Sequence, residues 1–368
     1  MWSSSIAIEG QNLGTLNQKS GLSYIDFAIG EKMLIFFIHG VATRNTDYAK
    51  PLQKALSEGL LQNHCPPAHY KAGFWGDVLN PLDDGTIQNH ISTDLHNEMQ
   101  KADGKVDVND LFRYRKIREE FISPFVVDLM SYLTPTRGRA IRQKLADQLI
   151  GFAKEHPNEK ELHIVCHSLG TVILWDSLFQ SRYHANDPAL RIRQFLGLGD
   201  CHTPRMASQL RLKSITTMGS PILYMNTMLG IKPETIKQFA QKNAPTPLKW
   251  LNIIHASDVI AYPLRSSLKM DSSWNLRFED KFVKWHTKDD VLQQAARTLS
   301  WDAAAMALST QKAHCNYWED PQVQHLILSQ QLVDHEAVNK SAHSQASEDY
   351  FEDVKSHLKN QLAGFLQM

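Results

Sequence analysis

The feature that most constrains the fold is one serine between an apolar run and a helical pattern. Leu162–Cys166 reads as a buried strand, and Thr171–Phe179 reads as a helix that starts directly after His-Ser-Leu-Gly. So short a strand–turn–helix holds the serine, Ser168, in a strained conformation with its hydroxyl projecting from the sheet. The turn needs small residues two positions before and after the serine. Gly170 meets this need, whereas Cys166 is larger than glycine or alanine. Ser168 is therefore the candidate nucleophile, the alternative being a structural serine in a buried turn.

Short apolar runs elsewhere predict the rest of a sheet. The four runs are Met33–Ile38, Leu162–Cys166, Ser214–Met218 and Trp250–Ile254. Each is followed by turn residues and usually by a helical pattern, of which Asp47–Leu61 and Thr171–Phe179 are the clearest. Strands that are apolar on both faces and alternate with helices predict an α/β fold, with a mostly parallel central sheet and helices on both faces.

The first two of these strands are separated by a stretch, about residues 76–160, that is too long for one simple crossover. Part of it predicts an apolar helical stripe: Phe121, Phe125, Leu129 and Leu133, with Ile122, Val126 and Met130 beside them. Pro124 falls in the first turn, where proline is tolerated. We expect one catalytic domain over residues 1–332, with an inserted helical cap at about 76–140. Residues 333–368 are expected to form a linker and a C-terminal amphipathic helix.

The composition excludes several classes of protein. With 368 residues, 42% hydrophobic and 21% charged, pervasive disorder and fibrous architecture are excluded. The 39 basic and 39 acidic residues leave no whole-chain basic field, so no nucleic-acid partner is expected. Four dispersed cysteines without a C-x-x-C pair indicate free thiols. No signal peptide is evident, and no apolar run approaches the roughly 18 residues of a membrane span. A cytoplasmic location is expected, with signal-less export left open.

The serine turn resembles the nucleophile elbow of the α/β-hydrolase fold, and specifically of lipase-like serine esterases. His-Ser-Leu-Gly-Thr-Val-Ile is also similar to the elbow of DDHD-type intracellular phospholipases. Upstream, Leu34–Gly40 looks like the family's strand ending in a His-Gly turn. The resemblance implies that backbone N–H groups of Val41 (or Ala42) and Leu169 bind an oxyanion. The residues expected to support these positions are His39, Gly40, His167 and Gly170. The alternative at Gly40 is a plain turn that uses its conformational freedom.

In such enzymes the acid and then the histidine follow the serine along the chain. A segment that resembles the family's acid loop places Asp258 after a strand, 90 residues beyond Ser168. His314, 56 residues further in a His-x-x-Tyr-Trp segment, is the expected base, with aromatic neighbours that would exclude water. No conspicuous strand precedes it, since Trp301–Ser309 reads as more helical. Two other histidines are ranked lower: His286 is the runner-up, and His255 lies too close to the acid's own strand.

Together these residues predict a serine hydrolase that cleaves carboxylic esters through an acyl-enzyme, with no metal and no cofactor. The apolar helix has basic flanks: Arg113, Arg115, Lys116 and Arg118 before it, and Arg137, Arg139, Arg142 and Lys144 after it. This pattern suits a lipid or acyl ester substrate and peripheral membrane contact through the cap. The alternative is a helix packed on the core beside solvated charges. A thioesterase, amidase or acyltransferase, or a non-catalytic binding protein of this fold, also stays open, as does the oligomeric state.

Overall fold

The computed structural model describes most of the chain between residues 32 and 332. The described ranges are 32–63, 65–78, 84–102, 118–181, 186–198, 210–242, 247–269, 273–284 and 312–332, with single residues 105, 107, 112 and 183. His286, the segment Trp301–Ser309 and the appendage expected at 333–368 lie outside them. The domain boundary expected at residue 332 therefore stays a prediction.

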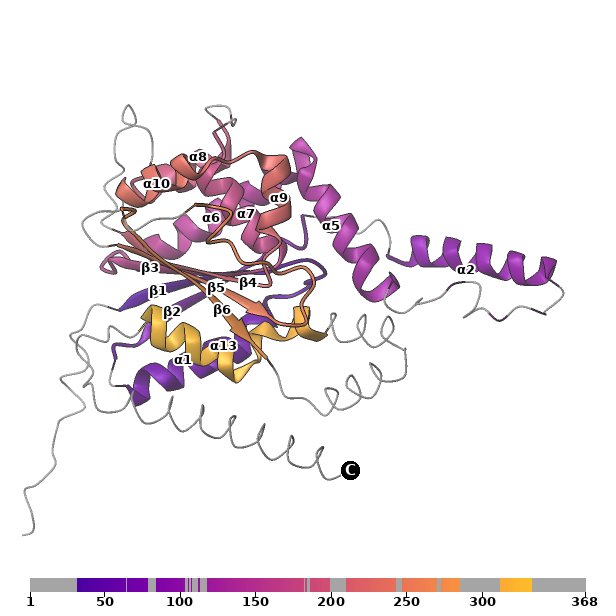
Figure 1. Ribbon diagram of the computed structural model, residues 1–368, viewed down its shortest axis with the longest axis horizontal. Helices are drawn as coiled ribbons and strands as arrows, with labels where there is room; N and C mark the ends of the chain where they lie inside the picture. Colours follow the sequence, from indigo (N-terminus) through magenta and orange to yellow (C-terminus); the bar gives the residue numbers. More distant parts are fainter. Residues whose placement is uncertain are drawn as a thin grey trace, which may run out of the picture. The chain divides into compact units, whose positions relative to one another are not determined.

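A six-stranded sheet lies at the centre of the described chain, and each neighbouring pair of strands is parallel. The strands are β1 (Met33–Ile38), β2 (Ala68–Gly73), β3 (Glu161–His167), β4 (Arg211–Met218), β5 (Leu248–His255) and β6 (Leu276–Val283). Their order across the sheet is β2-β1-β3-β4-β5-β6 (Figure 1). The four predicted strands are confirmed, and with them the α/β class.

The two strands that apolar runs do not predict, β2 and β6, form the edges of the sheet. In β2, five of six residues are only partly buried. In β6, the run Glu279–Lys281 carries three charges in succession. An edge strand is covered by only one neighbouring strand, so it does not need the continuous apolar run of a central strand.

Helices cover both faces of the sheet (Figure 1). One face packs against α6 (Pro135–Glu155), α7 (Leu169–Phe179), α8 (Pro188–Phe195), α9 (Ile222–Leu229) and α10 (Pro233–Lys242). The other packs against α1 (Lys50–Gln62), α13 (Pro321–Ile327) and the π-helical η5 (Leu328–Leu332). Short 3₁₀ turns are η2 (Thr46–Ala49) and η4 (Asn316–Trp318). The predicted helix over 47–61 is confirmed as η2 followed by α1, and that over 171–179 as part of α7.

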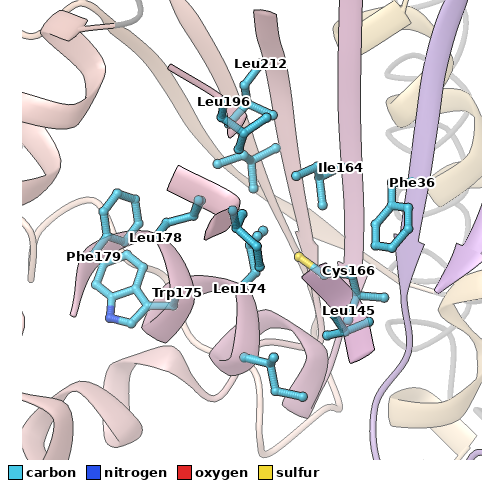
Figure 2. Packing of buried hydrophobic residues seen from close by; sticks show 14 of the residues in the cluster. Phe36, Leu145, Ile164, Cys166, Leu174, Trp175, Leu178, Phe179, Leu196 and Leu212 are labelled. Atoms are coloured by element: carbon cyan, nitrogen blue, oxygen red, sulfur yellow. The ribbon is translucent and has the colours of Figure 1, made fainter. Parts of the chain in front are cut away.

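The helix α7 is the most deeply buried of the described helices, because all eleven of its residues are buried. Figure 2 shows this packing, with Leu174, Trp175 and Leu178 of α7 and Ile164 and Cys166 of β3 among the labelled side chains. Burying a large apolar side chain stabilises a fold by roughly 1.5–3 kcal/mol. The start of α7, directly after Ser168, is therefore held firmly in place.

Between β2 and β3 the chain forms α2 (Asp84–Lys101), the π-helical η3 (Arg118–Ile122), α5 (Ser123–Leu133) and α6. The helix predicted from the apolar stripe is confirmed as η3 and α5. Leu129 and Leu133 pack against the core, whereas the residues beside the stripe are exposed: Ile122 (47%), Val126 (43%) and Met130 (60%). None of the helices in the described ranges combines the length and apolar character needed to cross a membrane.

The basic residues that follow α5 are not all exposed to solvent, as one of the two interpretations of the sequence required. Arg142 is 5% exposed, and its guanidinium donates to both carboxylate oxygens of Asp187, at 3.0 and 2.7 Å. Lys144 pairs with Asp77. The inclusion of Arg142 in a solvated flank is therefore wrong, because α6 turns that side chain inward.

Candidate active site

The turn after β3 has the strained geometry expected of an elbow. β3 ends at His167, Ser168 has φ 53° and ψ −127°, and α7 begins at Leu169. A positive φ at a non-glycine residue costs roughly 1–3 kcal/mol and persists only where the surroundings hold it. The N–H of Ser168 donates to the carbonyl of Met218 at 2.9 Å. The turn lies at the carboxyl end of β3, and the strand order of the sheet reverses between β3 and its neighbour β1. Doubly wound sheets bind their ligands at such a point of reversal, at the carboxyl ends of the strands.

Both glycines expected beside the elbow, Gly40 and Gly170, lie so close to neighbouring atoms that no larger residue fits there. A Cβ at Gly40 would lie 2.5 Å from the Cβ of Ser168, and a Cβ at Gly170 would lie 2.5 Å from the carbonyl oxygen of His39. Neither separation is sterically possible, so the turn after β1 packs directly against the elbow. Cys166, larger than the glycine or alanine expected there, fits because its thiol is buried and donates to a carbonyl oxygen of β4 at 3.2 Å.

The three residues expected to act together lie in one hydrogen-bonded chain. The Oγ of Ser168 lies 2.7 Å from Nε2 of His314, and Nδ1 of His314 lies 2.9 Å from Oδ2 of Asp258. All three are buried, at 0%, 1% and 5% exposure. The competing His255 ends β5, and its Nδ1 accepts the N–H of Ser257 at 3.1 Å. The structure thus brings together residues separated by up to 146 positions in the sequence.

The surroundings of Asp258 keep it ionised and so determine the tautomer of His314. Burial alone would raise the pKa of this carboxyl, but hydrogen bonds from His314, from the N–H of Ile260 and from the hydroxyl of Tyr317 hold it below its usual value. An ionised carboxylate only accepts hydrogen bonds. Nδ1 of His314 must therefore donate, which leaves Nε2 free to accept the hydroxyl proton of Ser168.

Two residues contact Asp258 in a way that the sequence did not predict, because Tyr317 was expected only as an aromatic neighbour of His314 and Gly219 was not named. The hydroxyl of Tyr317 donates to Oδ2 of Asp258 at 2.9 Å and accepts the N–H of His255 at 2.8 Å. Gly219, at φ 58°, leaves room for them, because a Cβ there would lie 3.1 Å from that Oδ2 and 3.0 Å from the tyrosine ring. The signal for Tyr317 was its position three residues after His314, since such a spacing places two side chains on one helical face.

Two buried histidines form hydrogen bonds with backbone groups beside the site. The Nε2–H of His167 donates to the backbone carbonyl of His314 at 2.6 Å. His39 accepts the N–H of Trp75 at Nε2 (3.1 Å) and donates from Nδ1 to the carbonyl of Gly40 (2.7 Å). Burial lowers the pKa of each histidine to about 3, so both are neutral at physiological pH. The two residues expected to support the site therefore fix the backbone at the base and at the turn after β1.

Acid is expected to destabilise the protein through His39 and His167. In the unfolded chain their pKa is about 6.5, whereas in the fold it is about 3. Between these values the unfolded chain binds protons that the folded chain does not, so the free energy of unfolding falls as the pH falls below 6.5. The expected loss from pH 7 to pH 5 is about 2 kcal/mol per histidine.

Urea unfolding at pH 7, 6 and 5 measures this loss. His167→Gln should reduce the pH dependence by about half, while His96→Gln, on an exposed face of α2, should leave it unchanged. An unfolding free energy that stays constant from pH 7 to pH 5 would contradict the burial of two neutral histidines.

The expected oxyanion donors belong to the two turns that pack against each other at Ser168. Leu169 is the first residue of α7, so its N–H has no acceptor within the helix. In the turn after β1, Ala42 has φ 56°, and its N–H donates to Oδ2 of Asp128 on α5 at 2.7 Å. Ala42 is therefore already engaged, which favours Val41 of the two alternatives. Asp128 is a buried carboxylate that the sequence motifs did not indicate.

Within the described ranges, no group of three or more histidine, cysteine, aspartate or glutamate side chains is arranged to hold a metal ion. Of the four cysteines, three lie in these ranges and form no disulfide there: Cys65, Cys166 and Cys315.

No protein-family model and no curated protein matches the chain. Among solved structures, an uncharacterized protein from Bacillus cereus is similar at 11% identity and a TM-score of 0.33, with 80% of this chain covered. This chain spans 65% of the length of that protein. Est1E from Butyrivibrio proteoclasticus, for which a ferulic acid complex also exists, is similar at 9% identity and a TM-score of 0.30, with 75% of this chain and 89–90% of that one covered. At such values no family membership follows.

Proposed function

We propose that the chain is a serine hydrolase that cleaves carboxylic esters through an acyl-enzyme. Ser168 is the nucleophile, His314 the general base and Asp258 the residue that orients the base. The observation that carries this proposal is the continuous hydrogen-bonded chain from the serine Oγ, through both ring nitrogens, to the carboxylate. A serine hydroxyl is a weak nucleophile near neutral pH and becomes effective only with such a base beside it.

The geometry supports a two-step acyl transfer. Nε2 of His314 takes the hydroxyl proton as Oγ of Ser168 attacks the ester carbonyl carbon, and Asp258 stabilises the resulting imidazolium. The imidazolium returns this proton to the leaving alcohol, and the acyl group stays on the serine. Water then attacks the acyl carbon and gives a proton to the same nitrogen. The bond from the acyl carbon to Oγ breaks as the imidazolium returns this proton to Oγ, which releases the carboxylic acid and restores the serine hydroxyl.

The negative oxygen formed in each step needs donors that are already in place. We assign this role to the N–H groups of Leu169 and Val41, because the N–H of Ala42 donates to Asp128. Each such donor typically contributes about 3–4 kcal/mol to the stability of the transition state. Asp128 then has an indirect role, since its hydrogen bond holds the turn that carries Val41.

A fluorophosphonate probe tests the proposed chemistry, because it reacts only with an activated serine. The wild-type chain should be labelled and Ser168→Ala should not. Labelling of both to the same extent, or of neither, would favour a non-catalytic binding protein. Matched ester, thioester and amide substrates then separate ester hydrolysis from the other reactions that the same three residues can perform.

For the substrate we propose a lipid or long-chain acyl ester. The support is an exposed apolar surface formed by Ile122 at the end of η3 and by Val126 and Met130 of α5, the helix whose Asp128 bonds the turn after β1. Val259, 54% exposed, lies next to the orienting acid in the sequence. Contact with a membrane surface through α5 is part of the same proposal.

Longer acyl chains are expected to be better substrates. Each buried methylene contributes about 0.8 kcal/mol, so kcat/KM should rise at least tenfold from acetyl to octanoyl esters. Met130→Gln should reduce this gain and leave acetyl ester hydrolysis nearly unchanged. Leu61→Gln, at a still more exposed apolar position on α1, serves as the control and should have no effect. A sharp preference for acetyl esters would contradict the proposal.

A further inference from the structure

A row of polar side chains crosses three neighbouring strands on one face of the sheet. In the register of the sheet, Thr217 of β4 lies beside Asn252 of β5, and Asn252 lies beside Asp280 of β6. Thr217 and Asn252 are buried, at 1% and 0% exposure. The row two residues earlier on these strands shares the same face and is apolar: Ile215, Trp250 and Phe278. Because burying polar groups costs free energy unless each finds a partner, the polar row indicates a specific role.

Hydrogen bonds along the row hold the amide of Asn252 in one orientation. The hydroxyl of Thr217 donates to Oδ1 of Asn252 at 2.8 Å. The amide nitrogen therefore points the other way, where it donates to Oδ1 of Asp280 at 2.8 Å and to the backbone carbonyl of Tyr262 at 3.0 Å. A flipped amide would place its NH₂ group against the donor hydroxyl and its oxygen against two acceptors. Asn252 thus connects β4, β6 and the loop that follows Asp258.

The carboxylate of Asp280 binds the backbone of the same loop. The N–H of Leu264 donates to both of its oxygens, at 3.1 and 3.2 Å, and the N–H of Arg265 donates to Oδ2 at 3.1 Å. Two successive N–H groups of this kind form a concavity that favours an anion. With the amide of Asn252, Asp280 accepts from three donors, which a carboxylate can do because it has only acceptor sites. The chain is therefore fixed to β6 just six residues after Asp258.

Hydrogen bonds within the loop connect this fixed point to the acid. The N–H of Ala261 donates to the backbone carbonyl of Asp258 at 3.3 Å, and the N–H of Ile260 donates to its Oδ1 at 3.0 Å. Ala261 and Leu264 are both buried, at 6% and 0% exposure. So short and compact a segment cannot move at Leu264 without moving the carboxylate of Asp258, whose Oδ2 lies 2.9 Å from Nδ1 of His314.

We infer that Asp280 is a positioning residue for Asp258, which deepens the proposed function and rests on it. Together with Asn252, it holds the far end of the acid loop, so that Oδ2 of Asp258 stays aligned with Nδ1 of His314. Asp280 acts through this loop and not on the ester. An apolar side chain at position 280 would suit the face of the sheet, but it would take the acceptor away from the N–H groups of Leu264 and Arg265.

Asp280→Asn in the full chain tests the inference. The side chain keeps its shape, but an NH₂ group replaces one acceptor oxygen and faces N–H donors. For a p-nitrophenyl ester, kcat should fall about 10–100-fold while KM stays nearly unchanged. The acid limb of the pH profile of kcat should also move to lower pH, because a displaced Asp258 stabilises the imidazolium less. The control Glu279→Gln removes the neighbouring charge, which pairs with Lys281, and should change neither.

A proton NMR signal separates failure of this inference from failure of the proposed function. The Nδ1–H of His314 that bonds Asp258 should give a downfield resonance, identified by its loss in His314→Gln. Asp280→Asn should move this resonance upfield, because the hydrogen bond becomes longer, while Glu279→Gln should leave it in place. The signal needs no ester hydrolysis, so it tests the positioning role even if the wild type cleaves no ester. A folded Asp280→Asn variant with the resonance of the wild type would overturn the inference.

Thr217→Val keeps the test valid if Asp280→Asn does not fold. It removes the hydroxyl that orients the amide of Asn252 and leaves the carboxylate of Asp280 in place. The resonance of His314 should then move in the same direction by a smaller amount, and kcat should fall with it. If Thr217→Val folds and both stay as in the wild type, the polar row does not position Asp258 and the inference is wrong.

Discussion

Ser168→Ala is expected to lower kcat for ester hydrolysis by roughly 10⁴–10⁶-fold while leaving KM almost unchanged. The loss is large because the hydroxyl oxygen, 2.7 Å from Nε2 of His314, forms the bond to the acyl carbon. Substrate binding does not depend on that bond, so KM should move little. Initial rates with a p-nitrophenyl ester, over a range of substrate concentrations, separate the two parameters.

A second variant distinguishes a catalytic unit from separate contributions. His314→Ala alone, and His314→Ala combined with Ser168→Ala, should each lose about as much activity as Ser168→Ala alone, because the base acts only through the serine. Ser266→Ala, at an exposed turn, should retain full activity. Losses that add in the double variant would mean that the two side chains do not act on the same proton.

Asp258→Asn is expected to lower kcat by roughly 10⁴-fold without unfolding the chain. The amide of asparagine can donate to Nδ1 of His314, which would place the ring proton on Nε2 and leave no acceptor for the hydroxyl of Ser168. The remaining amide oxygen can still accept from the N–H of Ile260 or from Tyr317, so the loop keeps part of its support. The measurement is kcat/KM together with the melting temperature.

Tyr317→Phe provides the comparison for this variant. It removes the hydrogen bond that the tyrosine hydroxyl donates to Asp258 and the one that it accepts from the N–H of His255. Each such bond typically contributes about 0.5–1.5 kcal/mol of stability. The ionised acid and the tautomer of His314 remain, so we expect a loss of activity near tenfold only. If Tyr317→Phe lost as much activity as Asp258→Asn, the orientation of the base would depend on the tyrosine rather than on the acid.

The parts of the site that the sequence predicted are those determined by neighbouring residues. The elbow at Ser168 follows from an apolar strand, one tight turn and a buried helix, all within about twenty residues. The pairing of Asp258 with His314 came from a resemblance to a family order, and the 2.9 Å contact agrees with it. The catalytic roles themselves remain proposals that the kinetic variants test.

Contacts between distant segments were not predictable in the same way. The edge strands β2 and β6 lack an apolar run because, in the part of the chain that the structure describes, one side of each has no neighbouring strand. Asp128 reaches Ala42 across 86 residues, and Arg142 reaches Asp187 across 45. In a single sequence these are ordinary helix charges, and only tertiary packing shows that they are buried. The sequence therefore indicated the proposed nucleophile but not the carboxylate that bonds the turn after β1.

Trapping the covalent intermediate tests the central claim most directly. The chain is mixed with an excess of a p-nitrophenyl ester, quenched with acid within milliseconds, digested and analysed by peptide mass spectrometry. We expect the acyl group on the peptide that contains Ser168, together with a burst of about one nitrophenolate per chain. An ester that is hydrolysed at the same rate with the acyl group on another residue, or on none, would contradict the assignment of Ser168 as the nucleophile.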